Sequence, residues 1–430
     1  MRTMRALAAA ALAAVALAAA GCAATDSYVA RGHDLGTAAA ALVPANAHAF
    51  VALDTDVRSS QWQRVDTLTK GFGGRAKLLD AIAAQLRAHG LTWKDDVQPA
   101  LGNEADVAVL SETEAVLFTK PSDVSKLKAL ASKVSSPGDE YTVQQIGGWS
   151  VVADSETAFS RVRAAERAAS LADDAQFKAA WARIGGDALA RVYAKPRQAN
   201  WAAARVSAGD DALRLDASVE PKNARPHAAG TSLLGDVPSG AALAVAFHGA
   251  PELLAKLPSL PAAQSAVRLL APLLTGDGLA YVRAVGLFPQ VALEFAPKDP
   301  QAALTAARTL LRTATALGGA LPLSAQLAGD KLVIADGPAA ASALRRGPKL
   351  VDDAAYKDAV AAAGVPQRPT FLAYADASAL APFLQLAAQQ LTGRALDPQI
   401  ADALGHLGTV VAWGTQRGAT DELHAWIRPR

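Results

Sequence analysis

Two aspartates directly after an apolar segment form the best candidate for a catalytic pair. Asp54-Thr55-Asp56 follows the apolar run Phe50–Leu53. Some phosphotransferases place a nucleophilic aspartate, an acid/base aspartate and a divalent metal at such a strand end. The companion residues are missing, since Arg58 stands where Thr or Val is needed. We therefore interpret Asp54 and Asp56 as caps of a strand-end turn, with a metal-dependent phosphohydrolase as the alternative.

Three other patterns contain reactive residue types. Ser125 and Lys128 have the Ser-x-x-Lys spacing of penicillin-recognising enzymes, but no Lys-Thr-Gly follows them. The pairs Asp173-Asp174 and Asp352-Asp353 each precede a predicted helix, where acidic side chains cap free N–H groups rather than bind metal. The histidines stand singly, without the spacing of metal ligands. The sequence therefore predicts no enzymatic activity, no metal and no cofactor.

Two tryptophans near the C-terminus are candidates for contact with a partner. Trp413 and Trp426 lie in the last predicted hairpin, with His424 between them in the sequence. Exposed tryptophans are strong anchors in protein interfaces, whereas tryptophans on neighbouring strands more often pack across the sheet. The sequence is compatible with both interpretations.

The single cysteine, Cys22, ends a segment that is typical of export. Arg2 and Arg5 precede the apolar run Ala6–Ala20, which is shorter than the roughly 20 residues that a transmembrane helix needs. With Gly21 before Cys22, the segment resembles a bacterial lipoprotein signal peptide. The resemblance implies cleavage between Gly21 and Cys22 and a lipid anchor, with acyl chains such as palmitate, on Cys22. A plain secretory signal is the alternative, but no other cysteine is present to pair with Cys22.

Composition narrows the class of the protein further. A chain that is 51% hydrophobic and 19% charged has too many apolar residues to remain disordered. The 42 basic residues are nearly balanced by 40 acidic ones, which disfavours nucleic acid as a partner. Removing residues 1–21 takes away only Arg2 and Arg5, which leaves 40 of each sign. We expect residues 22–41 to tether a globular protein to the extracytoplasmic face of the cell membrane.

The sequence repeats itself once after the tether. Val43-Pro44 recurs as Val237-Pro238, and Leu171–Lys178 recurs as Leu350–Lys357. Each copy ends in a predicted hairpin. Two copies are too few and too long for a solenoid, so we predict two duplicated lobes at residues 42–222 and 234–430.

The predicted strands come in adjacent pairs, with helices between the pairs. This arrangement favours the α+β class, with largely antiparallel sheets that are each covered by helices on one face. Two amphipathic helices are predicted at corresponding places in the repeats, after Ser122 and Asp299. Serine and aspartate both serve as helix N-caps, because either side-chain oxygen accepts from a backbone N–H.

Three segments carry a resemblance to a known family: Leu42–Asp54, Pro99–Gly102 and Leu171–Lys178. From about residue 40 onward, the chain resembles the domain of unknown function 3352 family of bacterial envelope proteins. No catalytic residues are established for the family. The resemblance therefore implies a location in the cell envelope and a fold, but no activity. We expect a non-catalytic interaction or scaffold module with envelope protein partners. The alternative is a carrier of an apolar ligand.

Overall fold

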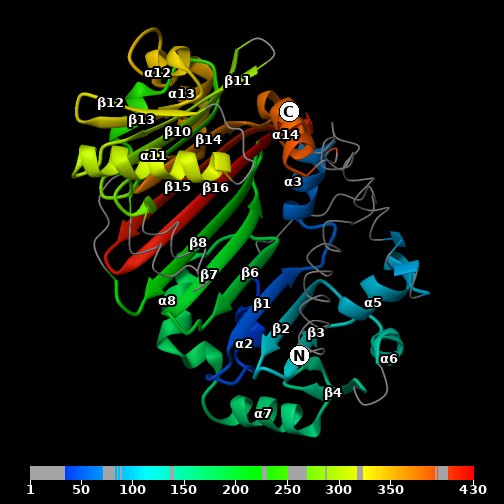
Figure 1. Cartoon of the computed structure of the whole chain (residues 1–430). Helices are drawn as coiled ribbons and strands as arrows, with labels where there is room; N and C mark the ends of the chain where they lie inside the picture. Colours follow the sequence, from blue (N-terminus) through cyan, green and yellow to red (C-terminus); the bar gives the residue numbers. More distant parts are fainter. Residues whose placement is uncertain are drawn as a thin grey trace. The chain divides into compact units, whose positions relative to one another are not determined.

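The computed structural model describes residues 34–70, 83–84, 86–87, 90–135, 140–224, 230–249, 269–285, 288–316, 323–392, 395 and 405–430. The chain forms two compact units (Figure 1). Unit 1 contains residues up to 224 together with 419–422, and unit 2 contains residues 225–418 and 423–430. The predicted signal peptide and Cys22 lie outside the described residues. Within the described part, no helix is long and apolar enough to cross a membrane.

Unit 1 is built on an antiparallel sheet with the strand order β8-β7-β6-β1-β2-β3-β5-β4. Its strands are β1 (Ala49–Asp54), β2 (Glu104–Val109), β3 (Ala115–Thr119), β4 (Thr142–Ile146), β5 (Trp149–Ala153), β6 (Ala190–Ala194), β7 (Ala199–Ala208) and β8 (Leu213–Pro221). Its helices are α2 (Thr37–Ala40), α3 (Ser60–Thr69), the π-helical η1 (Trp93–Val97), α5 (Gln98–Leu101), α6 (Val124–Val134), α7 (Glu156–Arg167), the 3-10 helix η2 (Leu171–Asp173) and α8 (Ala175–Arg183).

Helices lie on both faces of the unit 1 sheet, whereas the sequence predicted one covered face. Val116 and Phe118 of β3 share a core cluster with residues of α7 and α8. Leu117, between them, packs against clusters that contain residues of α5 and α6. The physical reason is visible in β3 itself, because an uninterrupted apolar strand is suited to burial on both sides.

Unit 2 has the strand order β16-β15-β14-β9-β10-β11-β13-β12. Its strands are β9 (Ala241–His248), β10 (Asp277–Val285), β11 (Phe288–Phe295), β12 (Ser324–Ala328), β13 (Lys331–Ala335), β14 (Phe371–Asp376), β15 (Leu407–Arg417) and β16 (Thr420–Pro429). Its helices are η3 (Ser232–Asp236), α11 (Pro300–Ala316), α12 (Pro338–Ala343), η4 (Leu350–Asp352), α13 (Ala354–Ala363) and α14 (Ala377–Thr392). Figure 1 shows α11 lying across the strands of this unit.

The repeated motifs meet in space in the same way in both units. The Leu171 N–H donates to the Val43 carbonyl at 2.6 Å, and the Leu350 N–H donates to the Val237 carbonyl at 2.9 Å. The strand order is also the same in the two units. The predicted α+β class with antiparallel sheets is therefore confirmed. That the units arose by duplication, and that the lobes have the predicted boundaries, stay predictions.

One predicted N-cap is shifted by a residue. Asp123, not Ser122, caps α6, because its carboxylate accepts from the Ser125 N–H at 2.8 Å. The Asp123 N–H donates to the Pro99 carbonyl at 3.1 Å, which holds residue 123 at the helix entrance. In unit 2 Asp299 caps α11 as predicted, accepting from the Gln301 and Ala302 N–H groups.

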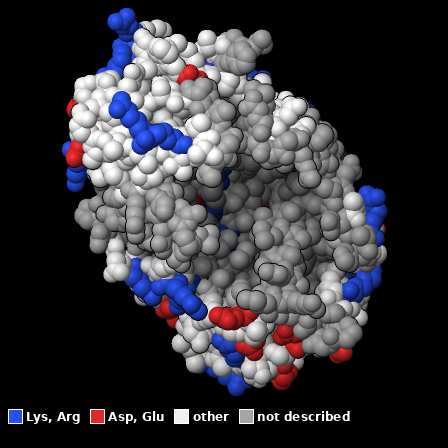
Figure 2. Space-filling model, in the orientation of Figure 1, with Lys and Arg blue, Asp and Glu red and all other residues white. Residues whose placement is uncertain are grey.

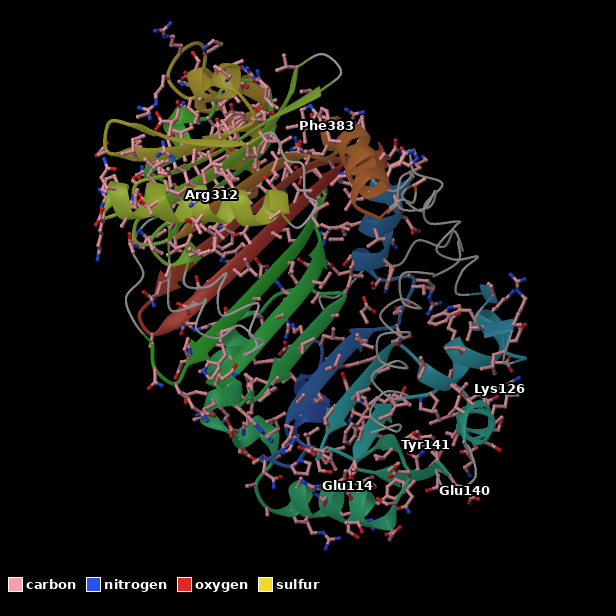
Figure 3. All side chains as sticks on the ribbon, in the orientation of Figure 1. Glu114, Lys126, Glu140, Tyr141, Arg312 and Phe383 are labelled. Carbon is pink, nitrogen blue, oxygen red and sulfur yellow. The ribbon has the colours of Figure 1, made fainter. Side chains whose placement is uncertain are left out.

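Surface charges of both signs are interspersed at the end of unit 1 that carries α7 (Figure 2). Arg161 of α7 donates to Glu114 at 2.7 Å and to the Leu110 carbonyl at 3.1 Å, which ties α7 to the β2–β3 turn. Figure 3 labels Glu114 beside this helix. Arg163 and Glu156 form a second ion pair on the same helix at 2.8 Å. Exposed pairs of this kind contribute little to stability, but they keep this surface free of a single-sign charge field.

Candidate functional site

The Asp54 carboxylate is used by the turn that follows β1. One oxygen accepts from the Asp56 N–H at 3.0 Å and the other from the Ser59 hydroxyl at 2.5 Å. Burial raises the pKa of Asp54 to about 7, against the opposing effect of these two hydrogen bonds. Asp56 in turn accepts from the Arg58 N–H at 3.1 Å. This arrangement is the self-capped strand-end turn that the sequence favoured.

The described residues offer no metal site to support the phosphohydrolase alternative. Among them, no group of three or more His, Cys, Asp or Glu side chains is placed to hold a metal ion. Asp54 itself is 8% exposed, and the Trp62 indole N–H donates to its backbone carbonyl at 3.0 Å. The two carboxylates thus fix the start of α3 rather than face an open site.

A buried carboxyl group that sequence reasoning missed lies on β2. Asp106 is fully buried, and neither of its oxygens accepts a hydrogen bond. Burial raises its pKa well above 3.8, and the nearby charge of Glu104 raises it further.

Glu104 and Arg191 form hydrogen bonds to the segment Asp34–Gly36, where the described part of unit 1 begins. The Gly36 N–H donates to Glu104 Oε1 at 2.6 Å. Arg191, which is 1% exposed, donates to Asp34 at 3.0 Å and to the Leu35 carbonyl at 3.4 Å. We call Asp34–Gly36, Glu104 and Arg191 the clasp. It fixes the end of the predicted tether to the sheet.

Glycine is required at the centre of the clasp. Gly36 has φ +82°, and a Cβ atom there would lie 2.7 Å from the Ala52 Cβ and 2.8 Å from Trp181 Cζ2. Ala52 pairs with Asp106 on one side and with Arg191 on the other. The backbone of Gly36 therefore contacts the sheet between a buried acid and a buried cation. The sequence gives little sign of this, because Gly36 and Glu104 are 68 positions apart.

Most carboxylates of the acidic pairs cap the starts of helices. Asp173 closes a capping box with Ser170, and Asp174 accepts from the Phe177 N–H at 2.9 Å at the start of α8. Asp353 differs from the expectation, because its carboxylate makes no cap to α13. It accepts instead from the Ser239 hydroxyl at 2.5 Å and the Gly240 N–H at 3.0 Å. It thereby ties η4 to the turn before β9.

The Ser-x-x-Lys pattern has no catalytic geometry. The Ser125 hydroxyl donates to Asp123 at 2.5 Å, so it belongs to the cap of α6. Lys128 is exposed, and Lys126 lies on the same helix, where Figure 3 labels it. No hydrogen bond joins Ser125 to either lysine within the described contacts.

Two polar clusters of unit 2 are also structural. Glu294 is fully buried between Arg345 at 3.2 Å and Lys331 at 3.5 Å, and Lys331 also contacts Asp236 at 2.5 Å. Burial raises the pKa of Glu294, which the two cations oppose.

The second cluster of unit 2 resembles a Ser-His-Asp triad in composition only. His248 contacts Asp277 at 2.7 Å, while the Ser232 hydroxyl donates to the other Asp277 oxygen. A nucleophilic serine needs its hydroxyl at the imidazole, not at the carboxylate. Because the Ser232 hydroxyl contacts Asp277 and not His248, the cluster lacks the contact that would activate a serine nucleophile.

The partner contact predicted for the two tryptophans is not supported by their exposure. Trp413 is 6% exposed and Trp426 is fully buried. Trp413 stacks on His424 with ring centroids 5.0 Å apart, and the Arg428 guanidinium lies 4.6 Å from the Trp426 ring. Cross-strand and cation–π packing explain both residues, and of the two interpretations that the sequence left open the packing one fits their burial.

Unit 1 leaves an apolar sheet face half exposed on β1, β6, β7 and β8. Residues that pair directly across antiparallel strands project from the same face. The pairing registers therefore place one set of side chains together, which we call apolar face 1: Ala49, Val51, Val192, Ala194, Ala202, Ala204, Val206, Leu215, Ala217 and Val219. Val192 is 37% exposed and Val206 is 36% exposed, whereas Tyr193 on the opposite face is fully buried.

Unit 2 presents the corresponding face on β9, β14 and β15. Its registers align a second set, apolar face 2: Leu243, Val245, Phe247, Phe371, Ala373, Ala375, Val410 and Ala412. These side chains are all partly exposed, whereas Ala244 and Val411 on the opposite face are fully buried. Neither face contains a charged residue. The sequence signal was present as alternation of apolar residues in the predicted hairpins, but alternation alone does not say which face is covered.

Comparison with known protein families supports one result of the sequence analysis, the resemblance to a family. A family model described as "Protein of unknown function (DUF3352)" matches residues 6–140, which confirms the resemblance to that family over this segment. No curated protein matches the chain.

Two solved structures are similar at low identity. "Structure of crystal form I of TP0453" has 12% identity and a TM-score of 0.18, and the match covers 74% of this chain and 100% of that chain. "Structure of crystal form IV of TP0453" has 11% identity and a TM-score of 0.18, covering 69% and 91%. Likenesses at this TM-score carry no conclusion about this chain.

Proposed function

We propose that this chain, whose residues 6–140 match a protein family of unknown function, is a non-catalytic binding or scaffold protein of the cell envelope. In this proposal Cys22 is lipidated and the protein is held at the extracytoplasmic face of the membrane. Its partners are envelope proteins within reach of the tether. The groups that sequence patterns offered for catalysis support the non-catalytic part, because Asp54, Asp56 and Ser125 are engaged in turns and caps.

The clasp is the observation that carries the proposal. It ties Asp34–Gly36 to the sheet through Glu104 and Arg191. About twelve residues separate Cys22 from Asp34, and they reach roughly 40 Å when fully extended. A buried attachment this close to the anchor holds the protein near one membrane surface and resists separation of the tether from the sheet.

Replacement of the cysteine tests the anchoring. We expect the native chain in the membrane fraction, labelled by an alkyne analogue of palmitate, and the Cys22→Ala chain without label. Ser27→Ala, in the same tether, is the matched control and should be labelled and fractionated like the native chain. A Cys22→Ala chain that is still cleaved and still membrane-bound would contradict lipid anchoring.

The non-catalytic part has its own test. Purified protein is assayed for hydrolysis of p-nitrophenyl phosphate with Mg²⁺, alongside Asp54→Asn. We expect no activity in either protein. Hydrolysis that disappears in Asp54→Asn would show that the phosphohydrolase alternative is right and this proposal wrong.

The two apolar faces favour a second candidate function, that of a carrier for an apolar ligand. Their side chains are partly exposed and uncharged, and soluble proteins seldom leave such surface open without a use for it. Native mass spectrometry of the purified chain tests this. A chain that is persistently free of ligand, and that takes up no apolar compound, would rule out the carrier.

A further inference from the structure

We propose that the clasp is a proton-operated latch, in which three buried carboxyl groups hold the segment Asp34–Gly36 on the sheet below neutral pH and release it above neutral pH. The three groups are Asp54, Glu104 and Asp106, which we call the acid trio. The latch concerns the attachment of this segment to the sheet of unit 1. It therefore goes beyond the function proposed above and does not require the lipid at Cys22.

The acid trio lies on one face of two paired strands. Asp54 of β1 pairs directly with Glu104 of β2, and directly paired residues project from the same face. Asp106 follows Glu104 by two positions on β2 and projects from that face as well. All three side chains are at most 9% exposed. Carboxyl groups that are close together in a buried place resist ionising together, so the trio retains protons.

Glu104 connects the acid trio to the clasp. Its Oε1 accepts from the Gly36 N–H at 2.6 Å, and Gly36 lies against Ala52, the residue that pairs with Asp106. A second charge in the trio therefore acts beside the atom that holds the segment. When the segment lifts, Glu104 reaches water, where the higher dielectric weakens the repulsion between carboxylates. Ionisation of the trio thus favours the open clasp, and protonation favours the closed one.

The surrounding charges are largely paired among themselves. Five other charged side chains surround the trio: Asp34, Asp56, Arg58, Lys120 and Arg191. Arg191 contacts Asp34 at 3.0 Å, and Arg58 contacts Asp56 at 3.4 Å. Lys120 lowers the pKa of Asp106, but burial of this carboxyl group has the larger effect. The trio therefore responds to pH rather than being held ionised by its neighbours.

Burial sets the pH range of the latch. It raises the pKa of Asp54 from 3.8 to about 7, against the hydrogen bonds that Asp54 accepts. The pKa of Asp106 is raised as well, first by burial and then by the charge of Glu104. The closed clasp thus holds a proton that the open clasp releases. Its stability is present at low pH and is lost as the pH rises through about 7.

Unit 2 shows that the fold does not require charges beneath the clasp. Counted from the repeated Val-Pro motif, Ala246 of unit 2 corresponds to Ala52 of unit 1. The neighbours of Ala246 on the adjacent strands are Leu279 and Leu372, which are both buried. The neighbours of Ala52 are an aspartate and an arginine. Buried charges are costly where leucine fits, so the charges of unit 1 have a role beyond packing.

The corresponding glycine of unit 2 is held by a backbone group instead. By the same count Gly230 corresponds to Gly36, and its N–H donates to the Pro369 carbonyl at 3.1 Å. A backbone carbonyl does not titrate, whereas Glu104 lies among acids that do. The latch is therefore a property of unit 1, where the predicted tether enters. Opening adds three residues to the free tether, which lengthens it by roughly 10 Å.

Hydrogen exchange of the Gly36 amide tests the latch. The purified full chain is exchanged at pH values from about 6 to about 9, and each rate is divided by the intrinsic rate at that pH. We expect protection of the peptide that contains Gly36 to fall roughly tenfold from about pH 6 to about pH 8, as one pKa unit of coupling gives. Asp54→Asn and Glu104→Gln each remove one charge and keep an acceptor oxygen. Protection in these variants should not change with pH, and one of them that folds is sufficient.

Two controls separate the latch from loosening of the whole unit. The Ala47 N–H donates to the Pro44 carbonyl at 2.9 Å in a turn outside the clasp. A single turn exchanges by local opening, so protection of Ala47 should be the same throughout the pH range. Asp173→Asn removes an acid that belongs to a capping box, and this variant should respond to pH like the native chain.

Three results overturn the proposal. Protection of Gly36 that is independent of pH in the native chain contradicts the latch directly. A parallel fall at Gly36 and Ala47 shows that unit 1 loosens as a whole. A native response in both Asp54→Asn and Glu104→Gln assigns the effect to a group outside the acid trio. Absence of lipid on Cys22 would contradict the anchoring proposed above and would leave each of these expectations unchanged.

Discussion

The surroundings of the Asp54 carboxyl group shift its pKa, although the group takes part in a turn and not in a catalytic site. Burial raises its pKa to about 7 from an ordinary value of 3.8. Between these two values the folded chain binds a proton that the unfolded chain has lost. The free energy of unfolding therefore decreases as the pH rises through this range, and the contribution of Asp54 is fully present only below about pH 4.

Asp54→Asn should remove this pH dependence. From about pH 5 to about pH 8 the variant should gain about 2–3 kcal/mol of unfolding free energy relative to the native chain, because about two pKa units of proton linkage disappear. Urea unfolding at a series of pH values measures the difference. Equal pH profiles for the two proteins would show that Asp54 is ionised in the folded state.

Asp173→Asn is the control of opposite sign. Hydrogen bonds from Ser170 lower the pKa of Asp173, so its contribution is present above the unfolded value of 3.8 and is lost only as the pH falls below it. Its profile should therefore run parallel to that of the native chain between about pH 5 and pH 8.

Residue types alone indicated the role of Asp54 but not that of Asp106. Asp54 and the two groups that donate to its carboxylate lie within five positions of one another, so the turn could be predicted from the local sequence. Asp106 alternates with apolar residues on a strand, and its burial depends on what packs above it. Its neighbours on the adjacent strands are Ala52 and Phe118, which are distant in the sequence. No local pattern contains that information.

Helix α6 gives a direct test at the scale of single elements. Asp123→Ala should lower the free energy of unfolding by about 1 kcal/mol, since the N–H groups of Ser125 and Lys126 lose their acceptor. Ser122→Ala should change it by less than about 0.5 kcal/mol, because the Ser122 hydroxyl only contacts the Pro99 carbonyl at 3.4 Å. Chemical unfolding of both variants decides between the two residues. A larger loss in Ser122→Ala would restore the cap that the sequence predicted.

The segment that enters unit 1 is tested at Gly36. Gly36→Ala places a methyl group against Ala52 and Trp181 and imposes a left-handed backbone on alanine, so we expect a loss of at least about 2–3 kcal/mol. Gly148→Ala, at φ +76° with nothing within 4 Å, suffers only the backbone effect of about 1 kcal/mol. Thermal unfolding of the two variants separates crowding from backbone strain. Equal losses would mean that the clasp is not closely packed.

The elements themselves were easier to predict than their layers. Paired apolar runs and acidic caps indicated the strands and the helix starts, and Asp174 is the N-cap of α8 as expected. Which face each helix covers was not predictable, because β3 is apolar on both sides and gives no preference. The half exposure of Val192 and Val206 likewise depends on what packs over β6 and β7, where α3 contacts Ala208, and this is a tertiary property.

At the scale of the whole molecule, the repeat was the strongest sequence signal for architecture. Val43-Pro44 and Leu171 were singled out as motifs, and the structure explains them as partners in one contact that recurs at Val237 and Leu350. The sequence could not show that these motifs touch. Spacing defines a repeat, but contact between distant segments requires the sheet that brings them together.

Charge balance gives the last prediction for the molecule as a whole. After removal of residues 1–21 the chain has 40 basic and 40 acidic residues, and both signs are interspersed around α7. A chain with equal numbers of basic and acidic residues has no net charge to attract it to an anionic bilayer, so attachment should depend on the lipid at Cys22. We expect cosedimentation of the Cys22→Ala chain with phosphatidylglycerol vesicles to be the same at about 50 mM and 300 mM salt. The same chain with an added polylysine tag should lose binding as salt increases. Strong, salt-sensitive binding of the untagged chain would mean that charge, rather than the acyl group, brings the protein to the membrane.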